Sequence, residues 1–119
     1  HQMVPVKGDT STASMIAHDG RIYFITVPSN TLSVWDISEK RVVASAKIEG
    51  KQVREASLGM HEGALYTLTE DAVLRIAPDT LEVTEVARPE DFEITTAGAT
   101  IAEEGIYFGS GARLKLWRW

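Results

Sequence analysis

The stretches "HDGRIYF" (18–24), "HEGALYT" (61–67) and "EEGIYF" (103–108) share one pattern, a polar turn that ends in glycine and leads into an aromatic strand. Asp-Gly and Glu-Gly turns beside apolar strands are typical of tight β-hairpins, because glycine adopts positive φ at little cost. A hairpin that returns three times in a chain of 119 residues indicates a repeated all-β unit.

The repeat has a regular period. Its tyrosines, Tyr23, Tyr66 and Tyr107, are 43 and 41 residues apart. Pairs of small residues ten positions before each tyrosine keep the same spacing: 13–14, 56–57 and 97–98. A period of about 40–45 residues built from four short strands is the signature of a β-propeller blade. The sequence therefore predicts an all-β chain of three four-stranded antiparallel blades, at about 11–48, 54–87 and 94–119.

Each of the first two units contains four strand-like segments. Several of them alternate apolar and polar residues, as "TLSV" does at 31–34, and Gly, Pro, Asn or Asp separate them. No segment keeps a helical period beyond two turns, so we expect no helix. The expected strands are 13–17, 21–27, 31–37 and 41–48 in the first unit, and 55–60, 64–69, 72–77 and 80–87 in the second.

The third unit is one strand short. Its strands are expected at 95–102, 105–111 and 112–119. Residues 3–7 form a spare segment, since "VPVKG" ends 12 residues before Gly20 just as "AKIEG" ends 13 residues before Gly63. We expect residues 3–7 to complete the last blade, in this chain or in a partner chain, because this closure removes an exposed sheet edge.

Three blades are too few for a closed propeller, which typically has 4–8. Two copies joined head to tail would form a six-bladed ring with twofold symmetry. The alternatives are a fragment of a larger propeller and an open monomer. The monomer is disfavoured because it would expose two apolar blade faces to water. The partner that we expect is therefore a second copy or the rest of a larger propeller.

The composition and net charge argue against several classes of partner and chemistry. The chain is 44% hydrophobic and 24% charged, as ordinary globular domains are. Its net charge of −5 disfavours nucleic acid and anionic membranes as partners. It has no cysteine, which excludes disulfides and thiolate chemistry. No apolar run approaches the roughly 20 residues of a membrane helix.

Two longer stretches resemble known propeller repeats. "SNTLSVWDISEKRVVASAKIEG" (29–50) resembles the YVTN-type bacterial repeat, in which an "N-T-V-S-V-I-D" strand precedes a turn and a "V-V-A-T-I" strand. "LYTLTEDAVLRIAPDTLEVTEVA" (65–87) is similar to quinoprotein-like and lactonase-like repeats. The resemblance covers 11–119 and implies a propeller fold, but it implies no particular activity. The tryptophan motifs that support a quinone in quinoproteins have no counterpart here, so no cofactor is expected.

The loops that lead into the first strand of each blade are the first place to look for a ligand site, because such loops lie together at one mouth of a propeller channel. They span 7–12, 49–55 and 87–93. Solvated loops without a ligand would also be polar. Their mixed-charge residues are Asp9, Lys51, Arg54, Glu55, Arg88, Glu90 and Asp91.

Other polar residues have simpler explanations. His18 and His61 lie in the repeated turns, which would be solvated in any case and too far apart to share a metal ion. Ser14, Ser57 and Ser110 lack a G-x-S-x-G elbow and a matched base. We therefore predict no metal site, and no catalytic residue can be assigned.

The sequence favours a non-catalytic binding or assembly module. One alternative is a lactonase-like or glycan-processing enzyme with its site at the channel mouth. Another is a carbohydrate-binding module, in which exposed Trp117 or Trp119 stacks on a sugar. A small molecule or a sugar would be the ligand in these alternatives.

Overall fold

The computed structural model describes residues 8–54, 57–88, 99–110 and 112–119. These residues form strands and no helix, which confirms the all-β prediction, and they contain no candidate for a membrane-spanning helix. The spare segment 3–7 lies outside the described residues. The strands are β1 (Ser11–His18), β2 (Arg21–Val27), β3 (Thr31–Asp36), β4 (Arg41–Lys47), β5 (Gly59–His61), β6 (Ala64–Leu68), β7 (Val73–Ile76), β8 (Val83–Ala87), β9 (Ala99–Ile101), β10 (Gly105–Ser110) and β11 (Arg113–Arg118).

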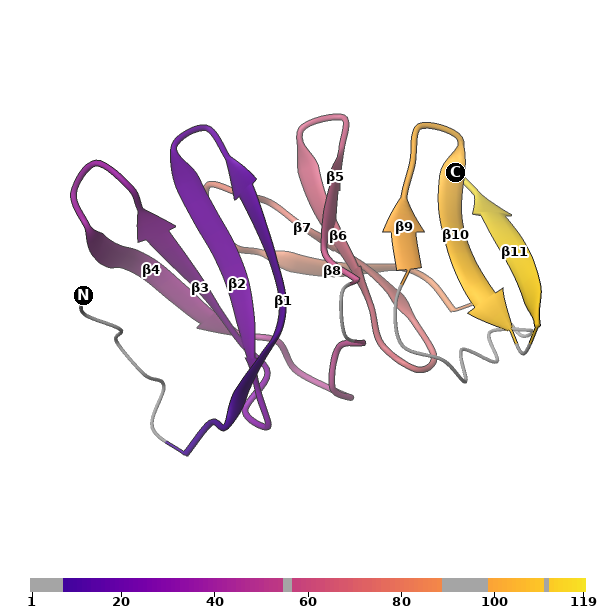
Figure 1. Cartoon of the computed structure of the whole chain (residues 1–119), viewed down its shortest axis with the longest axis horizontal. Helices are drawn as coiled ribbons and strands as arrows, with labels where there is room; N and C mark the ends of the chain where they lie inside the picture. Colours follow the sequence, from indigo (N-terminus) through magenta and orange to yellow (C-terminus); the bar gives the residue numbers. More distant parts are fainter. Residues whose placement is uncertain (1–7, 55–56, 89–98, 111) are drawn as a thin grey trace. The chain divides into compact units, whose positions relative to one another are not determined.

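The strands form three antiparallel sheets in which neighbours in sequence are neighbours in space. The first sheet has the order β1-β2-β3-β4 and the second the order β5-β6-β7-β8. The third has three described strands, in the order β11-β10-β9. Figure 1 shows each sheet as a simple up-and-down arrangement of hairpins. The predicted grouping of strands into units of four, four and three is therefore present among the described residues.

Two predicted strands were too long. The prediction for 55–60 is wrong at Ser57 and Leu58, because β5 begins at Gly59, and residues 55 and 56 lie outside the described residues. Ser57 instead donates its hydroxyl hydrogen bond to the Arg54 carbonyl, a loop interaction within the chain. The prediction for 80–87 also began too early, since β8 begins at Val83. Leu81 has a φ of 62°, which is incompatible with an extended strand.

The repeated glycine turn adopts the same backbone conformation in the first two units. Asp19 and Gly20 have φ values of 49° and 73°, and Glu62 and Gly63 have 47° and 77°. Positive φ at both central residues is the signature of a type I′ hairpin turn. The predicted positive φ at these glycines is confirmed.

The turns between the third and fourth strands repeat as well. Lys40 and Leu81, which are 41 residues apart, have φ values of 53° and 62°. Each donates its N–H to the carbonyl four residues earlier, Asp36 or Ala77, at 2.8 Å. Leu81 is 6% exposed, so burial offsets the cost of a left-handed leucine, which is roughly 1–2 kcal/mol.

The chain divides into two compact units, His1–Gln52 and Val53–Trp119. In the first unit the core side chains project from one face of the β1–β4 sheet, because alternate residues of a strand point the same way. They include Ile25 and Leu32, which are paired across β2 and β3 and are both 0% exposed.

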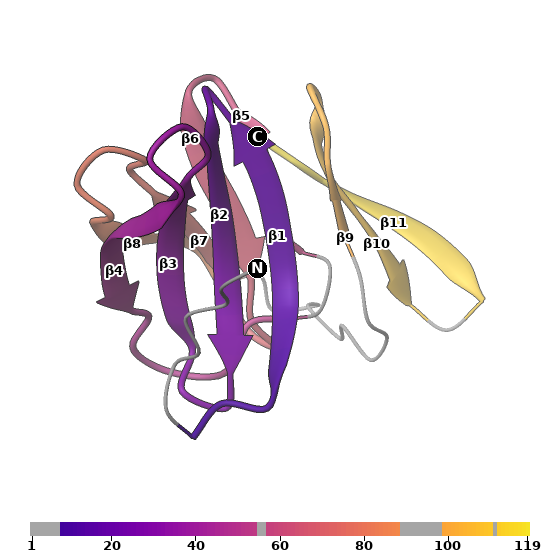
Figure 2. The same ribbon diagram turned by 60° about the vertical axis from the view of Figure 1, so that its left-hand side comes forward.

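In the second unit the β5–β8 sheet packs against the β9–β11 sheet. Figure 2 shows β10 and β11 as a long twisted hairpin with the short β9 beside β10. The two sheets share a core of Leu68, Val73, Ile106 and Phe108. At Gly59 they approach so closely that an added Cβ would overlap the side chain of Ile101.

We expect Gly20→Ala to destabilise the chain by about 1–2 kcal/mol, because the left-handed backbone penalises a Cβ. An added Cβ at Gly20 meets nothing within 4 Å, so the loss would be purely conformational. Chemical denaturation measures it. Gly20→Asn is the matched control and should lose clearly less, since asparagine tolerates this conformation. Equal losses for the two variants would contradict the assigned turn.

We expect Gly59→Ala to destabilise the second unit by about 1–3 kcal/mol, because the methyl group overpacks the contact with Ile101. Removing the overlapping γ carbons by Ile101→Ala should recover part of this loss in the double variant. Denaturation of both single variants and of the double variant gives the coupling energy. Strictly additive losses would show that the two sheets do not meet at Gly59.

Candidate functional site

The structure describes four of the seven charged residues predicted in the connecting loops: Asp9, Lys51, Arg54 and Arg88. The other three, Glu55, Glu90 and Asp91, lie outside the described residues. Asp9 and Lys51 belong to the first unit, and Arg54 and Arg88 to the second.

Asp9 binds the turn between β2 and β3. Its carboxylate accepts hydrogen bonds from the backbone N–H of Ser29 at 2.8 Å and from the Ser29 hydroxyl at 2.5 Å. Desolvation alone would raise the pKa of Asp9, but the hydrogen bonds, above all that from the Ser29 hydroxyl, outweigh it and lower the pKa. The charged carboxylate therefore anchors the start of β1 to this turn.

Lys51 reaches the same turn through its backbone. Its carbonyl accepts a 2.9 Å hydrogen bond from the side-chain amide of Asn30, which is 3% exposed. The neighbouring Gln52 donates from its side chain to the Pro28 carbonyl at 3.1 Å. The loop before β1 and the loop after β4 thus meet at the turn 28–30.

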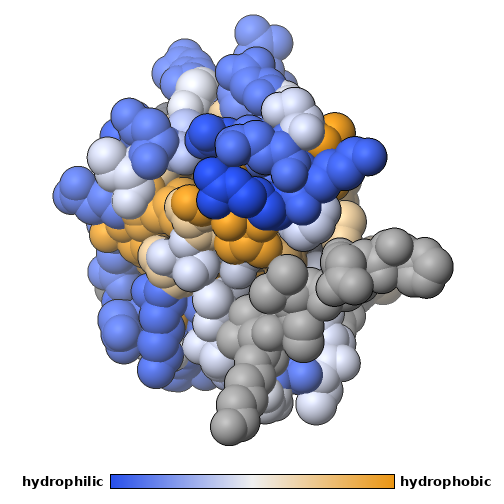
Figure 3. Space-filling model, turned by 90° about the vertical axis from the view of Figure 1, so that its left-hand side faces the viewer, coloured by the Kyte–Doolittle hydropathy of each residue, from blue (hydrophilic) through white to orange (hydrophobic). Residues whose placement is uncertain are grey.

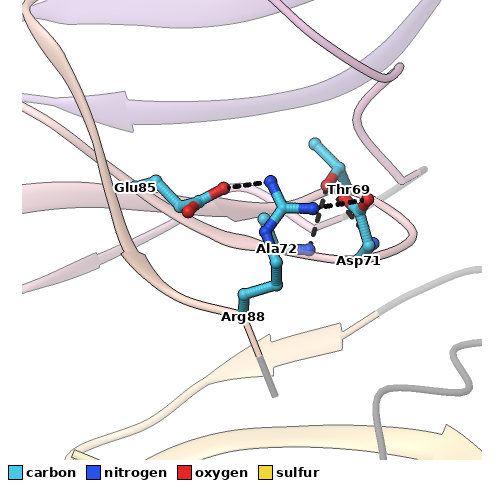
Figure 4. Close-up of polar contacts among 5 residues, drawn as sticks. All are labelled: Thr69, Asp71, Ala72, Glu85 and Arg88. Carbon is cyan, nitrogen blue, oxygen red and sulfur yellow. Dashed lines mark hydrogen bonds and ion pairs between the residues drawn. The ribbon is translucent and has the colours of Figure 1, made fainter. Parts of the chain in front are cut away.

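Arg88 has an equivalent role in the second unit. Its guanidinium donates to Asp71 at 3.0 Å and to Glu85 at 2.6 Å (Figure 4). Asp71 lies in the turn between β6 and β7, where the backbone N–H of Ala72 donates to the Thr69 hydroxyl at 3.1 Å. The hydrogen bond to Glu85, followed by the two carboxylate charges, raises the pKa of Arg88. The ion pairs fasten the end of β8 to this turn.

Arg54 approaches the same region through its backbone. Its N–H donates to the Leu68 carbonyl at 2.6 Å, next to the isolated bridge between Val53 and Thr69. The structure therefore brings the four described residues together as two pairs, one in each unit. Each pair lies at the turn between the second and third strands, so these contacts stabilise loops and turns.

The tryptophans proposed for sugar stacking take part in an aromatic cluster. The Trp119 ring stacks on the imidazole of His61, with centroids 4.2 Å apart and planes 13° apart. Tyr66 lies 4.5 Å from the Trp119 ring, and Trp117 lies 5.6 Å from it. Trp119 also donates its indole N–H to the Ala102 carbonyl at 2.9 Å. The cluster joins β5 and β6 to the end of β11.

Ser57, one of the three serines considered as nucleophiles, is 0% exposed. Its hydroxyl lies 2.7 Å from that of Thr67 and 2.6 Å from the Arg54 carbonyl to which it donates. His18 is 3.2 Å from the carboxylate of its neighbour Asp19, within the solvated turn. Both residues are thus engaged in local structure.

An open polar hollow of about 200 Å3 on β7 and the β8 hairpin was not predicted from the sequence. Its lining residues are Arg75, Ala77, Glu82 and Thr84. The signal in the sequence was an arginine inside the otherwise apolar run "AVLRIA" at 72–77.

The described residues contain no group of three or more His, Cys, Asp or Glu side chains that could hold a metal ion. In comparisons with known proteins, no family model and no curated protein matches the chain.

We expect Asp9→Asn to lower the denaturation midpoint at neutral pH, because the uncharged amide accepts hydrogen bonds more weakly. Since the folded-state pKa of Asp9 is lowered, its contribution is present above the unfolded pKa of about 3.9 and is lost as the pH falls through the folded pKa. The two curves of stability against pH should therefore begin to approach each other below about pH 4 and meet only below the lowered folded-state pKa of Asp9. The exposed carboxyl of Glu49 supplies the control, Glu49→Gln, which should leave the midpoint unchanged.

Proposed function

We propose that this chain is a non-catalytic assembly module, a set of β-propeller blades whose two outermost sheet faces are covered by further blades. The observation that carries the proposal is the unequal burial of the three sheets. A blade in a ring has a neighbour on each face, whereas a terminal blade in an isolated stack has a neighbour on one face only.

The β5–β8 sheet is buried on both faces. The register of β6 and β7 puts Leu65 and Ile76 on one face and Leu68 and Val73 on the other. All four side chains are 0% exposed. Leu68 and Val73 belong to the core that this sheet shares with β9–β11.

The β1–β4 sheet has its fully buried large apolar side chains on one face, whereas the other face buries the small Ser33. Its buried face includes Ile25 and Leu32, both 0% exposed. Its other face carries Met15, which is 61% exposed and lies opposite the half-buried Phe24. Half-buried Trp35 lies on the same face. Figure 3 shows apolar residues gathered in a band on the side of the molecule that carries this sheet, with polar residues around them.

The β9–β11 sheet has the same asymmetry. Ile106 and Phe108 are 0% and 6% exposed on the face that packs within the second unit. On the other face, Tyr107 lies opposite Leu116, both half-buried, and Leu114 is 73% exposed. Side chains of this kind on one sheet face are typical of an interaction surface.

A second copy covers both outer faces at once. Head-to-tail association places the outer face of the first sheet of one copy against the outer face of the third sheet of the other, and twofold symmetry repeats the junction. The result is a six-bladed ring, which is within the usual range for propellers. Further blades of a longer chain would cover the same two faces, and this is the competing arrangement.

Light scattering of the purified chain tests the proposal. We expect twice the chain mass of 13.1 kDa. Met15→Glu and Leu114→Glu should each shift the chain toward the monomer, because each places a charge in a junction. Thr80→Glu, in an exposed turn, adds the same charge outside both faces and should leave the dimer intact. A wild-type chain that stays monomeric at all concentrations would contradict the ring of two copies.

The enzymatic and carbohydrate-binding alternatives stay predictions. Titration with oligosaccharides tests the second of them, since a sugar stacked on Trp117 or Trp119 would change the tryptophan fluorescence. An unchanged spectrum across neutral and charged oligosaccharides would argue against that alternative.

A further inference from the structure

The junction between the two sheets of the second unit joins two different faces of the repeat. The β5–β8 sheet contributes the face that carries Tyr66 and Leu68. The β9–β11 sheet contributes the face that carries Ile106 and Phe108. We call these the tyrosine face and the phenylalanine face of a sheet. Each sheet of the repeat has one face of each kind, because the residues on either side of the repeat tyrosine point the opposite way.

The partly exposed face of the first sheet is a phenylalanine face. Ile22 pairs with Trp35 across β2 and β3. In the same way, Ile106 pairs with Trp117 across β10 and β11. A phenylalanine follows each isoleucine by two residues, so both faces present the same Ile, Phe and Trp side chains.

Backbone hydrogen bonds support this equivalence of the first and third sheets. Ile37, two residues after the tryptophan of its sheet, donates its N–H to the Gly20 carbonyl at 3.0 Å. Trp119, two residues after the tryptophan of its own sheet, donates its N–H to the Glu104 carbonyl at 3.3 Å. The two acceptors each precede the paired isoleucine by two residues. The alignment therefore holds from the turn before the isoleucine to the residue that follows the tryptophan strand.

The partly exposed face of the third sheet is a tyrosine face. Tyr107 lies on it and pairs with Thr100 of β9, as Tyr66 pairs with Gly59 of β5. The chain therefore has one partly exposed face of each kind. These are the two kinds of face that pack together inside the second unit, so two copies can form the same kind of junction with each other.

Residue sizes at one position of the junction favour this pairing. In the second unit Gly59 lies against Ile101, and an added Cβ at Gly59 would overlap that side chain. A tyrosine face with a larger residue at this position needs a smaller residue opposite it. Thr100 holds the position of Gly59 on the third sheet. Ala17, which pairs with the isoleucine of the first sheet, holds the position of Ile101.

A second pair of positions shows the opposite exchange of size. Leu68 follows the tyrosine of its sheet by two residues and belongs to the shared core, whereas Gly109 holds this position on the third sheet. Ala99 packs against that core and pairs with the phenylalanine of its sheet. Met15 holds the same position on the first sheet and is 61% exposed. The tyrosine face thus loses a large side chain and the phenylalanine face gains one.

We propose that the phenylalanine face of one copy packs on the tyrosine face of a second copy, with Ala17 of the first against Thr100 of the second. This inference rests on the proposed ring of two copies and specifies the residues of its junction. Ala17 and Thr100 are both exposed in the single chain, as the two halves of an unformed contact should be. Each copy uses both faces, so the junction forms twice.

Cysteine trapping tests the contact, since the chain has no native cysteine. Ala17→Cys and Thr100→Cys are placed in separate chains that are co-expressed and then oxidised. We expect a covalent dimer of twice 13.1 kDa on a non-reducing gel, because the two Cβ atoms would lie within reach of a disulfide. Thr80→Cys, in an exposed turn, replaces Ala17→Cys in the control and should give no bridge.

Each cysteine variant expressed alone should stay uncross-linked, because the proposed junction brings unlike faces together. A bridge formed by either variant alone would overturn the pairing of unlike faces. The absence of a bridge in the co-expressed pair would overturn the contact between Ala17 and Thr100.

An exchange of side-chain size tests the same contact without a covalent bond, with sedimentation as the measure of dimer dissociation. Ala17→Ile should weaken the dimer by about tenfold or more, because the larger side chain would overlap Thr100 of the second copy. Adding Thr100→Gly should recover most of this loss, since the pair then reproduces Gly59 against Ile101. Thr80→Ile adds an apolar side chain in an exposed turn and should leave the dissociation constant unchanged.

The outcomes separate this inference from the proposed ring. Because Ala17 is exposed, Ala17→Ile should keep the circular dichroism spectrum of the wild-type chain, so that a weaker dimer reports on the junction. A wild-type dimer that Ala17→Ile leaves intact would overturn the contact and preserve the ring. A wild-type chain that is monomeric would overturn both proposals.

Discussion

A β-sheet with apolar side chains on its two faces must shield each face from water, and the rest of this structure depends on that constraint. The β5–β8 sheet meets it fully, with Leu65 and Leu68 on opposite faces and both 0% exposed. On the first and third sheets, Met15 and Leu114, which are 61% and 73% exposed, mark faces that remain partly open. The free energy gained by burying apolar surface is roughly proportional to the area buried and does not depend on direction. The open faces therefore favour any partner of matching shape. In the proposed ring, a second copy would cover both faces.

The hydrogen bonds and ion pairs of the loops stabilise the same sheets. Asp9 and Arg88 come from loops that the sequence marks as candidate ligand sites, yet each binds a turn in its own unit. A loop held in this way positions the strand that follows or precedes it, and so positions the sheet faces. The described loop contacts therefore stabilise the sheets, and the proposed assembly would use the partly exposed apolar faces.

Much of the local structure could be predicted from the sequence. The hairpin glycines and the alternation of residues are local signals, and β2 begins and ends where they place it, at Arg21 and Val27. Errors occurred where a tertiary or loop contact overrode alternation, as at Ser57, whose hydroxyl binds a loop carbonyl, and at Leu81, whose burial permits a left-handed backbone. The candidate loops were located correctly as polar connections, but their partners were not predictable, because Ser29 and Asp71 carry no signal of pairing with residues about 20 positions away.

The sequence by itself determined the type of strand, the hairpin turns and the period of about 42 residues, because side-chain alternation and glycine φ are properties of neighbouring residues. Only the tertiary structure decided which sheet faces are buried, which charged groups are engaged, and that Trp119 stacks on His61 rather than standing free. Burial and pairing depend on segments far apart along the chain, and a strand pattern alone does not specify which segment will cover it.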